Sequence, residues 1–168
     1  QEFKPKLILD LSTLTGQQHS KSCGLFGSIM GKNEDTIKKF IVAGKKTNDK
    51  VVELPLYDEF VRNTESEIAD VKNSEYKCGA STIHAGAFLS HFIDEKQDWI
   101  HIDIAGPSFI NERTTGFGVR LLTEYLQGEK DNTKIKELKK KLTLPLFNVQ
   151  RKVYNCSLTR GKAFNMNV

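Results

Sequence analysis

Long hydrophobic runs are missing from this sequence. No apolar stretch among its 168 residues approaches the ~20 residues that a membrane-spanning helix needs, so a helical membrane anchor is excluded within these residues and no membrane partner is expected. With 38% hydrophobic and 27% charged residues, the composition is that of a folded globular protein. The chain begins with Gln1 instead of Met, so the absence of a targeting segment excludes no compartment.

Cysteine is also sparse. Cys23, Cys78 and Cys156 are widely spaced and odd in number, and they form neither a CxxC pair nor a disulfide framework. We therefore expect a reducing, cytoplasmic location. The net charge is only +4, with most of the excess after residue 128. Because the rest of the chain lacks a contiguous basic stretch, we expect no nucleic-acid partner.

Short strand signals alternate with helix signals along most of the chain. Residues 7–11 are almost all apolar, which is typical of a strand buried on both faces. Further strand-like runs fall at residues 24–30, 51–55 and 98–107. Strands that alternate with helices predict an α/β fold with a mainly parallel sheet and helices on both faces.

The clearest helix signal follows Asn33. Asn33 can cap a helix, Glu34 and Asp35 suit its positive start, and Lys45 and Lys46 suit its end. A narrow apolar stripe at helical spacing is formed by Ile37, Phe40 and Ile41.

Two more helices are expected, at residues 79–93 and in the segment 114–127. The first is rich in small residues, which lets neighbouring backbones approach closely. The region after Gly128 is different, because a charge-dense helix candidate is followed by residues with no clear period. We therefore divide the chain into residues 1–127 and a basic, divergent extension at 128–168.

Histidine and carboxylate side chains are the first candidates for chemistry. His101 and Asp103 alternate along one expected strand, so their side chains share a face. One strand supplies only two ligands, fewer than a zinc site needs, so hydrogen bonding at the strand's end is favoured over a metal or catalytic pair. His84 and His91 lie two helical turns apart without an HExxH spacing, and a structural or solvated role is favoured for both.

A glycine loop and a basic segment are weaker candidates. Gly116 and Gly118 precede a helix, so their amides could meet an anion. The full G-x-G-x-x-G pattern is missing, which leaves a dinucleotide-binding protein as a minor alternative to a tight turn. No Ser lies in a G-x-S-x-G elbow. The stretch KIKELKKK is favoured as a solvated helix face over an arm for an acidic partner.

Several segments together resemble the leucine (cytosol) aminopeptidase family. In the family's order and at about its spacing, they are LILDLSTLTG, LPLYDEF, ADVKNS, STIHAGAFLSHF, WIHIDIAGPSF and TGFGVRLLTEYL. The resemblance covers about residues 3–127 and corresponds to the C-terminal part of the family's catalytic domain. It implies a three-layer α/β/α sandwich around a mixed, mainly parallel sheet, with this chain as a partial domain.

The resemblance also implies an activity. The family consists of exopeptidases that release N-terminal residues, often leucine, from peptides. Two divalent ions, zinc or manganese, polarise the scissile carbonyl and activate a bridging water. The family usually assembles as a hexamer, so the expected partners are a peptide substrate and either further copies of this chain or the missing N-terminal part.

The family's metal ligands have no counterpart in this sequence. They are a lysine, three aspartates and a glutamate, taken in part from an Asn-Thr-Asp-Ala-Glu-Gly-Arg motif, and all precede the strand that corresponds to residues 7–11. No segment here resembles that motif, and Asp10 does not correspond to a ligand. We therefore expect no catalytic or metal-binding residue in this chain, and no activity from the chain alone.

The wall of the substrate pocket does carry over. The family's Thr-Leu-Thr-Gly loop touches the substrate through backbone groups, and the alanine of its Asp-Ile-Ala-Gly strand end lines the same pocket. The corresponding residues, including one on the leaving-group side, are Thr13, Leu14, Gly16, Ala105, Ser108 and Ser74. For Thr13, Gly16 and Ala105, turn geometry and tight packing are the alternative explanation. A strict preference for leucine is not expected, because the residues at Ser12, Gln17, Ser74 and Ser108 each make the wall more polar than the family's usual residue does.

Two functions are consistent with these features. The first is the C-terminal portion of an aminopeptidase that works only with its metal-binding part. The second is a non-catalytic aminopeptidase-like module with a structural or interaction role. In either case the strands that flank residues 7–11 in the family are missing, so we expect an exposed sheet edge and an isolated chain that aggregates or needs a partner.

Overall fold

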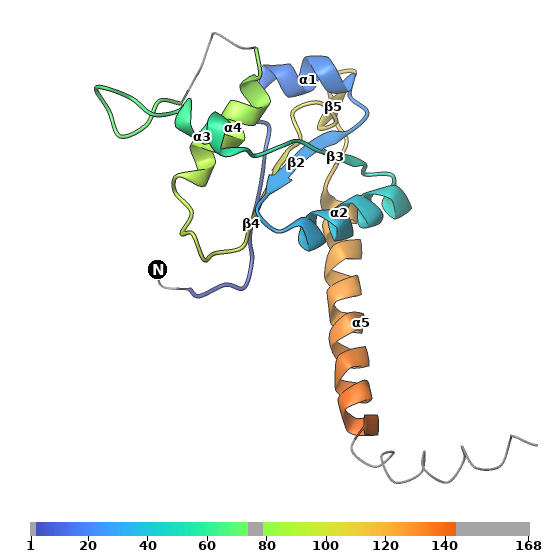
Figure 1. Ribbon diagram of the computed structural model, residues 1–168. Helices are drawn as coiled ribbons and strands as arrows, with labels where there is room; N and C mark the ends of the chain where they lie inside the picture. Colours follow the sequence, from blue (N-terminus) through green and yellow to red (C-terminus); the bar gives the residue numbers. More distant parts are fainter. Residues whose placement is uncertain (1–2, 74–78, 144–168) are drawn as a thin grey trace, which may run out of the picture. The chain divides into compact units, whose positions relative to one another are not determined.

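The computed structural model describes residues 3–73 and 79–143 of the chain (Figure 1). The chain divides into two units, Gln1–Leu126 and Gln127–Val168. The first unit contains the sheet and the candidate site. Of the second unit, the structure describes the helical residues 127–143.

Four strands form a mixed sheet in the order β1-β4-β2-β3. They are β1 (Ile8–Ser12), β2 (Gly27–Gly31), β3 (Val51–Glu53) and β4 (Trp99–Asp103). β1 is parallel to β4 and β2 is parallel to β3, while β2 and β4 are antiparallel. The mixed, mainly parallel sheet of an α/β fold is therefore confirmed.

β1 lies at one edge of the sheet, with β4 as its one partner in the part of the chain that the structure describes. All five of its residues are half-buried. The interpretation of residues 7–11 as a strand buried on both faces is thus wrong for this chain. An apolar run indicates how much surface a strand can bury, but the neighbours that cover it decide how much is buried.

Within residues 3–73 and 79–143, five helices connect or follow the strands. They are α1 (Gly16–Ser22), α2 (Glu34–Thr47), α3 (Asp58–Arg62), α4 (Ser81–Ser90) and α5 (Val119–Thr143), and a small hairpin of β5 (Phe109–Ile110) and β6 (Arg113–Thr114) precedes α5. As the sequence predicts, Asn33 caps α2, and its side chain accepts a hydrogen bond from the Thr36 amide at 3.1 Å. α5 is one helix through Gly128, where the sequence suggests two, because a single glycine costs a helix only about 1 kcal/mol.

The two faces of the sheet carry different side chains. Ile29 and Met30 are neighbours on β2 and point to opposite faces. Ile29 lies in the apolar cluster with residues of α2, whereas Met30 packs against Gly86 of α4, where an added Cβ would lie 2.7 Å from the Met30 sulfur. α2 and α4 therefore cover opposite faces. The buried members of the apolar cluster are Ile29, Ile37, Phe40, Ala43, Val51, Ile100, Ile102 and Leu121.

Candidate functional site

The candidate site is built where β1 and β4 end side by side. Ser12 closes β1 and pairs with Asp103, which closes β4. The chain leaves β1 through the loop 13–15 and enters α1 at Gly16, and Thr15 is the N-cap of that helix. Parallel pairing thus brings a hydroxyl-rich loop and a buried carboxylate to one edge of the sheet, where open α/β sheets bind their ligands.

The Asp103 carboxylate joins this loop to the end of β4. Its Oδ1 accepts hydrogen bonds from the backbone amides of Leu14 at 3.2 Å and of Ala105 at 3.0 Å. Its Oδ2 accepts from the Thr15 amide at 3.1 Å and from the Thr15 hydroxyl at 2.7 Å. The side chain is fully buried. Asp103 therefore makes the strand-end hydrogen bonds that the sequence favours for it, and they tie two loops together.

Thr15 and Thr82 extend this network to α4. Their hydroxyl oxygens lie 2.8 Å apart. Because Thr15 has a single hydroxyl proton and donates it to Asp103, Thr82 is the donor in this contact. Thr15 also accepts from the Gln18 amide at 3.3 Å, which completes the cap of α1.

The buried Gln18 side chain also links separate parts of the fold, and nothing in the sequence marks it as a site residue. Its side-chain oxygen accepts from the Gly106 amide at 3.0 Å, and its amide nitrogen donates to the Phe26 carbonyl at 2.9 Å and to the Ser28 hydroxyl at 3.1 Å. Phe26 and Ser28 lie at the start of β2, whereas Gly106 follows β4, so the contacts join two segments that are far apart in the sequence. Only the fold shows that one side chain reaches all of them.

Two of the predicted wall residues line a pocket of about 390 Å³. They are Leu14, which is 43% exposed, and Gly16. Residues of the same loop, of α4 and of the segment before it complete the lining: Thr15, Asn73, Ser81, His84, Ala85, Phe88 and Leu89. Thr13 is exposed in the loop, and Ser74 lies outside the described residues.

Ala105 and Ser108 lie beyond the end of β4 and do not line that pocket. Asp103 nevertheless ties Ala105 to Leu14. The Ser108 hydroxyl donates to the Ala105 carbonyl oxygen at 3.3 Å, and His19 Nδ1 lies 3.2 Å from the same oxygen. The Ser108 hydroxyl group thus donates its hydrogen bond to the backbone of the protein.

The histidines fall into separate environments. His101 is fully buried, and its Nδ1 lies 2.5 Å from Asp10, whose other oxygen accepts from the Trp99 indole at 2.6 Å. His91 Nε2 lies 2.6 Å from the Thr64 hydroxyl, and His84 is buried with its ring edge-on to Phe60. The sequence cannot reveal the contact between Asp10 and His101, because it depends on the register of β1 against β4.

The described residues do not fit a metal site. Among residues 3–73 and 79–143, no three His, Cys, Asp or Glu side chains are grouped so that they could hold an ion. The carboxylates nearest the candidate site, Asp103 and Asp10, are already hydrogen-bonded within the fold.

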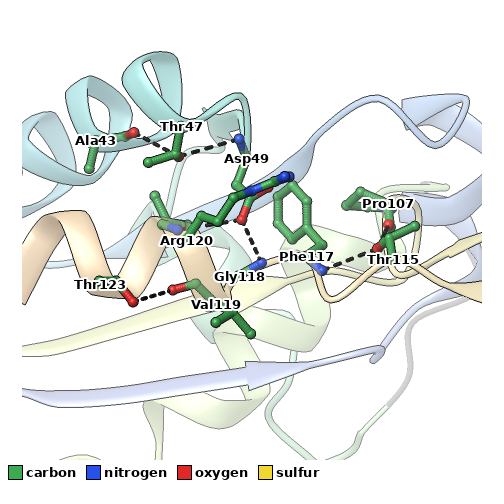
Figure 2. A network of polar contacts seen from close by, with 11 residues as sticks. Ala43, Thr47, Asp49, Pro107, Thr115, Phe117, Gly118, Val119, Arg120 and Thr123 are labelled. Atoms are coloured by element: carbon green, nitrogen blue, oxygen red, sulfur yellow. Dashed lines mark hydrogen bonds and ion pairs between the residues drawn. The ribbon is translucent and has the colours of Figure 1, made fainter.

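The glycine loop before α5 faces a carboxylate of the protein itself (Figure 2). Asp49 is fully buried and accepts from the amides of Gly118 at 3.1 Å and Leu121 at 3.4 Å. Arg120 donates to the same carboxylate through Nε at 3.2 Å and Nη2 at 2.5 Å. This hydrogen bond, and then the negative charge, raise the pKa of Arg120 above its usual value. The Asp49 carboxylate therefore binds the Gly118 amide, one of the two that the sequence suggests for a bound anion.

Comparison with known proteins gives these features a context. The model of the cytosol aminopeptidase family's catalytic domain matches residues 1–123. The chain belongs to the cytosol aminopeptidase family. The resemblance of its segments to that family is thus confirmed. Members of this family are peptidases and depend in general on metal ions.

Curated relatives match over most of this chain but over a small part of their own length. A probable cytosol aminopeptidase of Chlorobaculum tepidum is 40% identical over 133 residues, which are 76% of this chain and 26% of the relative. Similar proteins from Geotalea uraniireducens and Phytoplasma mali are 41% identical over 137 residues and 42% identical over 135 residues. This chain thus spans about a quarter of the length of the relatives it matches.

A solved structure supports the same fold. A tomato leucine aminopeptidase mutant is similar with a TM-score of 0.66 and 29% identity, over 71% of this chain and 24% of the tomato chain. The aminopeptidase-like α/β fold that the sequence predicts is therefore confirmed. No described helix is long and apolar enough to cross a membrane.

Proposed function

We propose that this chain supplies the substrate-pocket wall of a leucyl aminopeptidase-like exopeptidase, which releases N-terminal amino acids from peptides. The observation that carries the proposal is the Asp103 carboxylate, which holds the amides of Leu14, Thr15 and Ala105 at one edge of the sheet. The two segments that correspond to the family's pocket wall thereby become one surface. Membership of the cytosol aminopeptidase family supports the reaction class.

Each predicted wall residue has a role in this proposal. Thr13, Leu14 and Gly16 form one side of the pocket and meet the N-terminal residue mainly through backbone groups. Ala105 and Ser108, which lie outside the 390 Å³ pocket, contribute the second segment of the wall through the link of Ala105 to Leu14 by way of Asp103. Ser74, which is outside the described residues, corresponds in sequence to the family's leaving-group side. The exposed loop residues suit this role, because a peptide must reach them from solvent.

The complete enzyme would take its two divalent ions, manganese or zinc, on other segments. The described residues of this chain do not fit such a site, and no part of the sequence resembles the family's metal-binding motif. We therefore propose that the chain alone is inactive. The names of its relatives suggest a cytosolic enzyme, and a hexamer or another homo-oligomer is the proposed assembly.

A hybrid protein tests the proposal. In it, the matching 133-residue region of the Chlorobaculum tepidum relative is replaced by the whole of this chain. With manganese or zinc we expect the hybrid to hydrolyse leucyl p-nitroanilide and the pure chain not to do so. A folded, metal-loaded hybrid without activity would contradict the proposal and favour a non-catalytic module. Activity of the pure chain would contradict the assignment of the metal ligands to other segments.

A further inference from the structure

We infer that Asp103 is a positioning residue for peptide binding: it turns the carbonyl groups of Thr13 and Leu14 toward the N-terminal backbone of the substrate. The inference rests on the proposed function and adds to it a side chain that does not itself touch the peptide. It starts from the four hydrogen bonds that this buried carboxylate accepts.

The orientation of the two carbonyls follows from peptide geometry. No peptide bond in the described residues is cis. In a planar trans peptide group the N–H and the C=O point in opposite directions. The Leu14 amide donates to Asp103, so the Thr13 carbonyl of the same peptide group points away from Asp103. The Thr15 amide also donates to Asp103, so the Leu14 carbonyl points away as well.

Outward carbonyls suit the end of a peptide that an aminopeptidase must recognise. The terminal amine and the next amide are hydrogen-bond donors, and a carbonyl oxygen is an acceptor. The loop residues Thr13, Leu14 and Gly16 are exposed, whereas Asp103 behind them is fully buried. A loop with its amides turned inward therefore offers acceptors at the surface where the substrate's donors arrive.

A carboxylate suits this position better than an amide would. All four partners of Asp103 are donors: the amides of Leu14, Thr15 and Ala105, and the Thr15 hydroxyl. An ionised carboxylate is an acceptor at both oxygens and has about four lone-pair sites. Asparagine has an NH2 group in place of one carboxylate oxygen. This NH2 group would face two of these donors and could not accept their hydrogen bonds. Asp103→Asn thus removes part of the network with almost no change in volume.

Asp49 offers a matched control for the substitution. It is as deeply buried as Asp103 and also accepts from backbone amides, those of Gly118 and Leu121. Its contacts lie at the start of α5 and include no wall residue. D49N and D103N in the hybrid therefore each disturb the backbone hydrogen bonds of a buried carboxylate. D49N also weakens the ion pair with Arg120, and only D103N releases the wall.

The experiment measures kcat, KM and the urea midpoint of unfolding for the hybrid, D103N and D49N with leucyl p-nitroanilide. Both variants are expected to lower the midpoint. For D103N we expect KM to rise about tenfold or more, as befits the loss of hydrogen bonds to a charged group, while kcat changes by less than about threefold. For D49N we expect KM within about twofold of the unsubstituted hybrid, because the contacts of Asp49 include no wall residue and transition-state and substrate binding are left as they were.

The outcomes separate the inference from the proposed function. A folded D103N hybrid with an unchanged KM would overturn the inference, as would a loss confined to kcat. If D103N does not fold, Thr15→Val decides, because it keeps the shape of the side chain but removes the hydroxyl that donates to Asp103, together with its contacts to Thr82 and to the Gln18 amide. A raised KM in that variant supports the inference, and an unchanged KM overturns it. Failure of the proposed function would appear earlier, as an inactive unsubstituted hybrid.

Discussion

Single glycines mark where backbone and side chains meet most tightly. A Cβ added at Gly31 would lie 2.5 Å from the Trp99 carbonyl oxygen on the neighbouring strand. A Cβ added at Gly86 would lie 2.7 Å from the end of the Met30 side chain. The first contact is with fixed backbone, whereas the second is with a flexible thioether that can move aside.

The two glycines should therefore differ when each is replaced by alanine. We expect Gly31→Ala to lower the free energy of unfolding by about 1–3 kcal/mol, because the strands must separate to admit the methyl group. Gly86→Ala should be within about 1 kcal/mol of neutral, since the gain in helix propensity offsets the shift of Met30. Urea unfolding compares the two, and an equal loss at both positions would contradict this account.

Asp49 and Arg120 form an ion pair whose two members differ in burial. The carboxylate is fully buried, while the Arg120 side chain is 64% exposed. Asp49→Ala should cost about 1–3 kcal/mol of stability or more, because the amides of Gly118 and Leu121 lose their acceptor. Arg120→Ala should cost less stability than Asp49→Ala, because it leaves the amides of Gly118 and Leu121 with their acceptor. A larger loss from the arginine than from the aspartate in thermal unfolding would contradict this assignment.

Among the elements, α2 is the helix whose ends are best marked in the sequence. Asn33 caps it, Glu34 and Asp35 lie in its first turn, and Lys45 and Lys46 lie in its last turn, as the sequence predicts. The Asn33 side chain also donates to Asp98 at 3.1 Å, which ties the helix start to the residue before β4. The cap therefore stabilises both the helix and its place on the sheet.

Replacing Asn33 should reduce the stability of the protein more than the replacement of most partly exposed residues does. We expect Asn33→Ala to lower stability by about 1 kcal/mol, the usual cost of a lost N-cap. Lys38→Ala is the control in the same helix, because the exposed pair of Lys38 with Glu34 should contribute less to stability than the cap does. Circular dichroism during urea unfolding measures both, and equal midpoints would show that the cap contributes nothing.

Contacts between elements were less predictable than the elements themselves. The helix after Asn33, the strand at residues 51–55 and the strand ending near Gly106 can be predicted because local signals mark them. The partners of Asp49 lie about 70 residues further along the chain, and Leu14 and Thr15, which bond Asp103, lie about 90 residues before it, so no local pattern indicates these contacts. The edge position of β1 depends likewise on which strands stand beside it, which its own residues cannot reveal.

At the scale of the whole molecule, the free edge of β1 bears on how the protein behaves in solution. Its backbone groups on the side away from β4 have no strand partner among the described residues. Several large apolar side chains are well exposed, including Leu25 at 72% and Ile68 at 97%. Unpaired edges and exposed apolar side chains both favour association.

The purified chain should therefore associate as its concentration rises. Light scattering over a dilution series is expected to show a mean mass above that of the 19.0 kDa chain at the higher concentrations. The hybrid protein, in which other segments can cover the edge, is the comparison and should give one defined mass. A stable monomer at all concentrations would show that the edge is not a site of association.

The order of the strands in the sheet also has a consequence for the order of folding. β2 and β3 pair across the short segment that contains α2, so their contacts close a small loop early and at little entropic cost. β1 must wait for β4, since Thr15 meets Asp103 across 88 residues. During synthesis, Asp103 emerges long after the loop that it holds. The half of the sheet around α2 should gain protection from hydrogen exchange first, and the amides of Leu14 and Thr15 should be among the last to gain it.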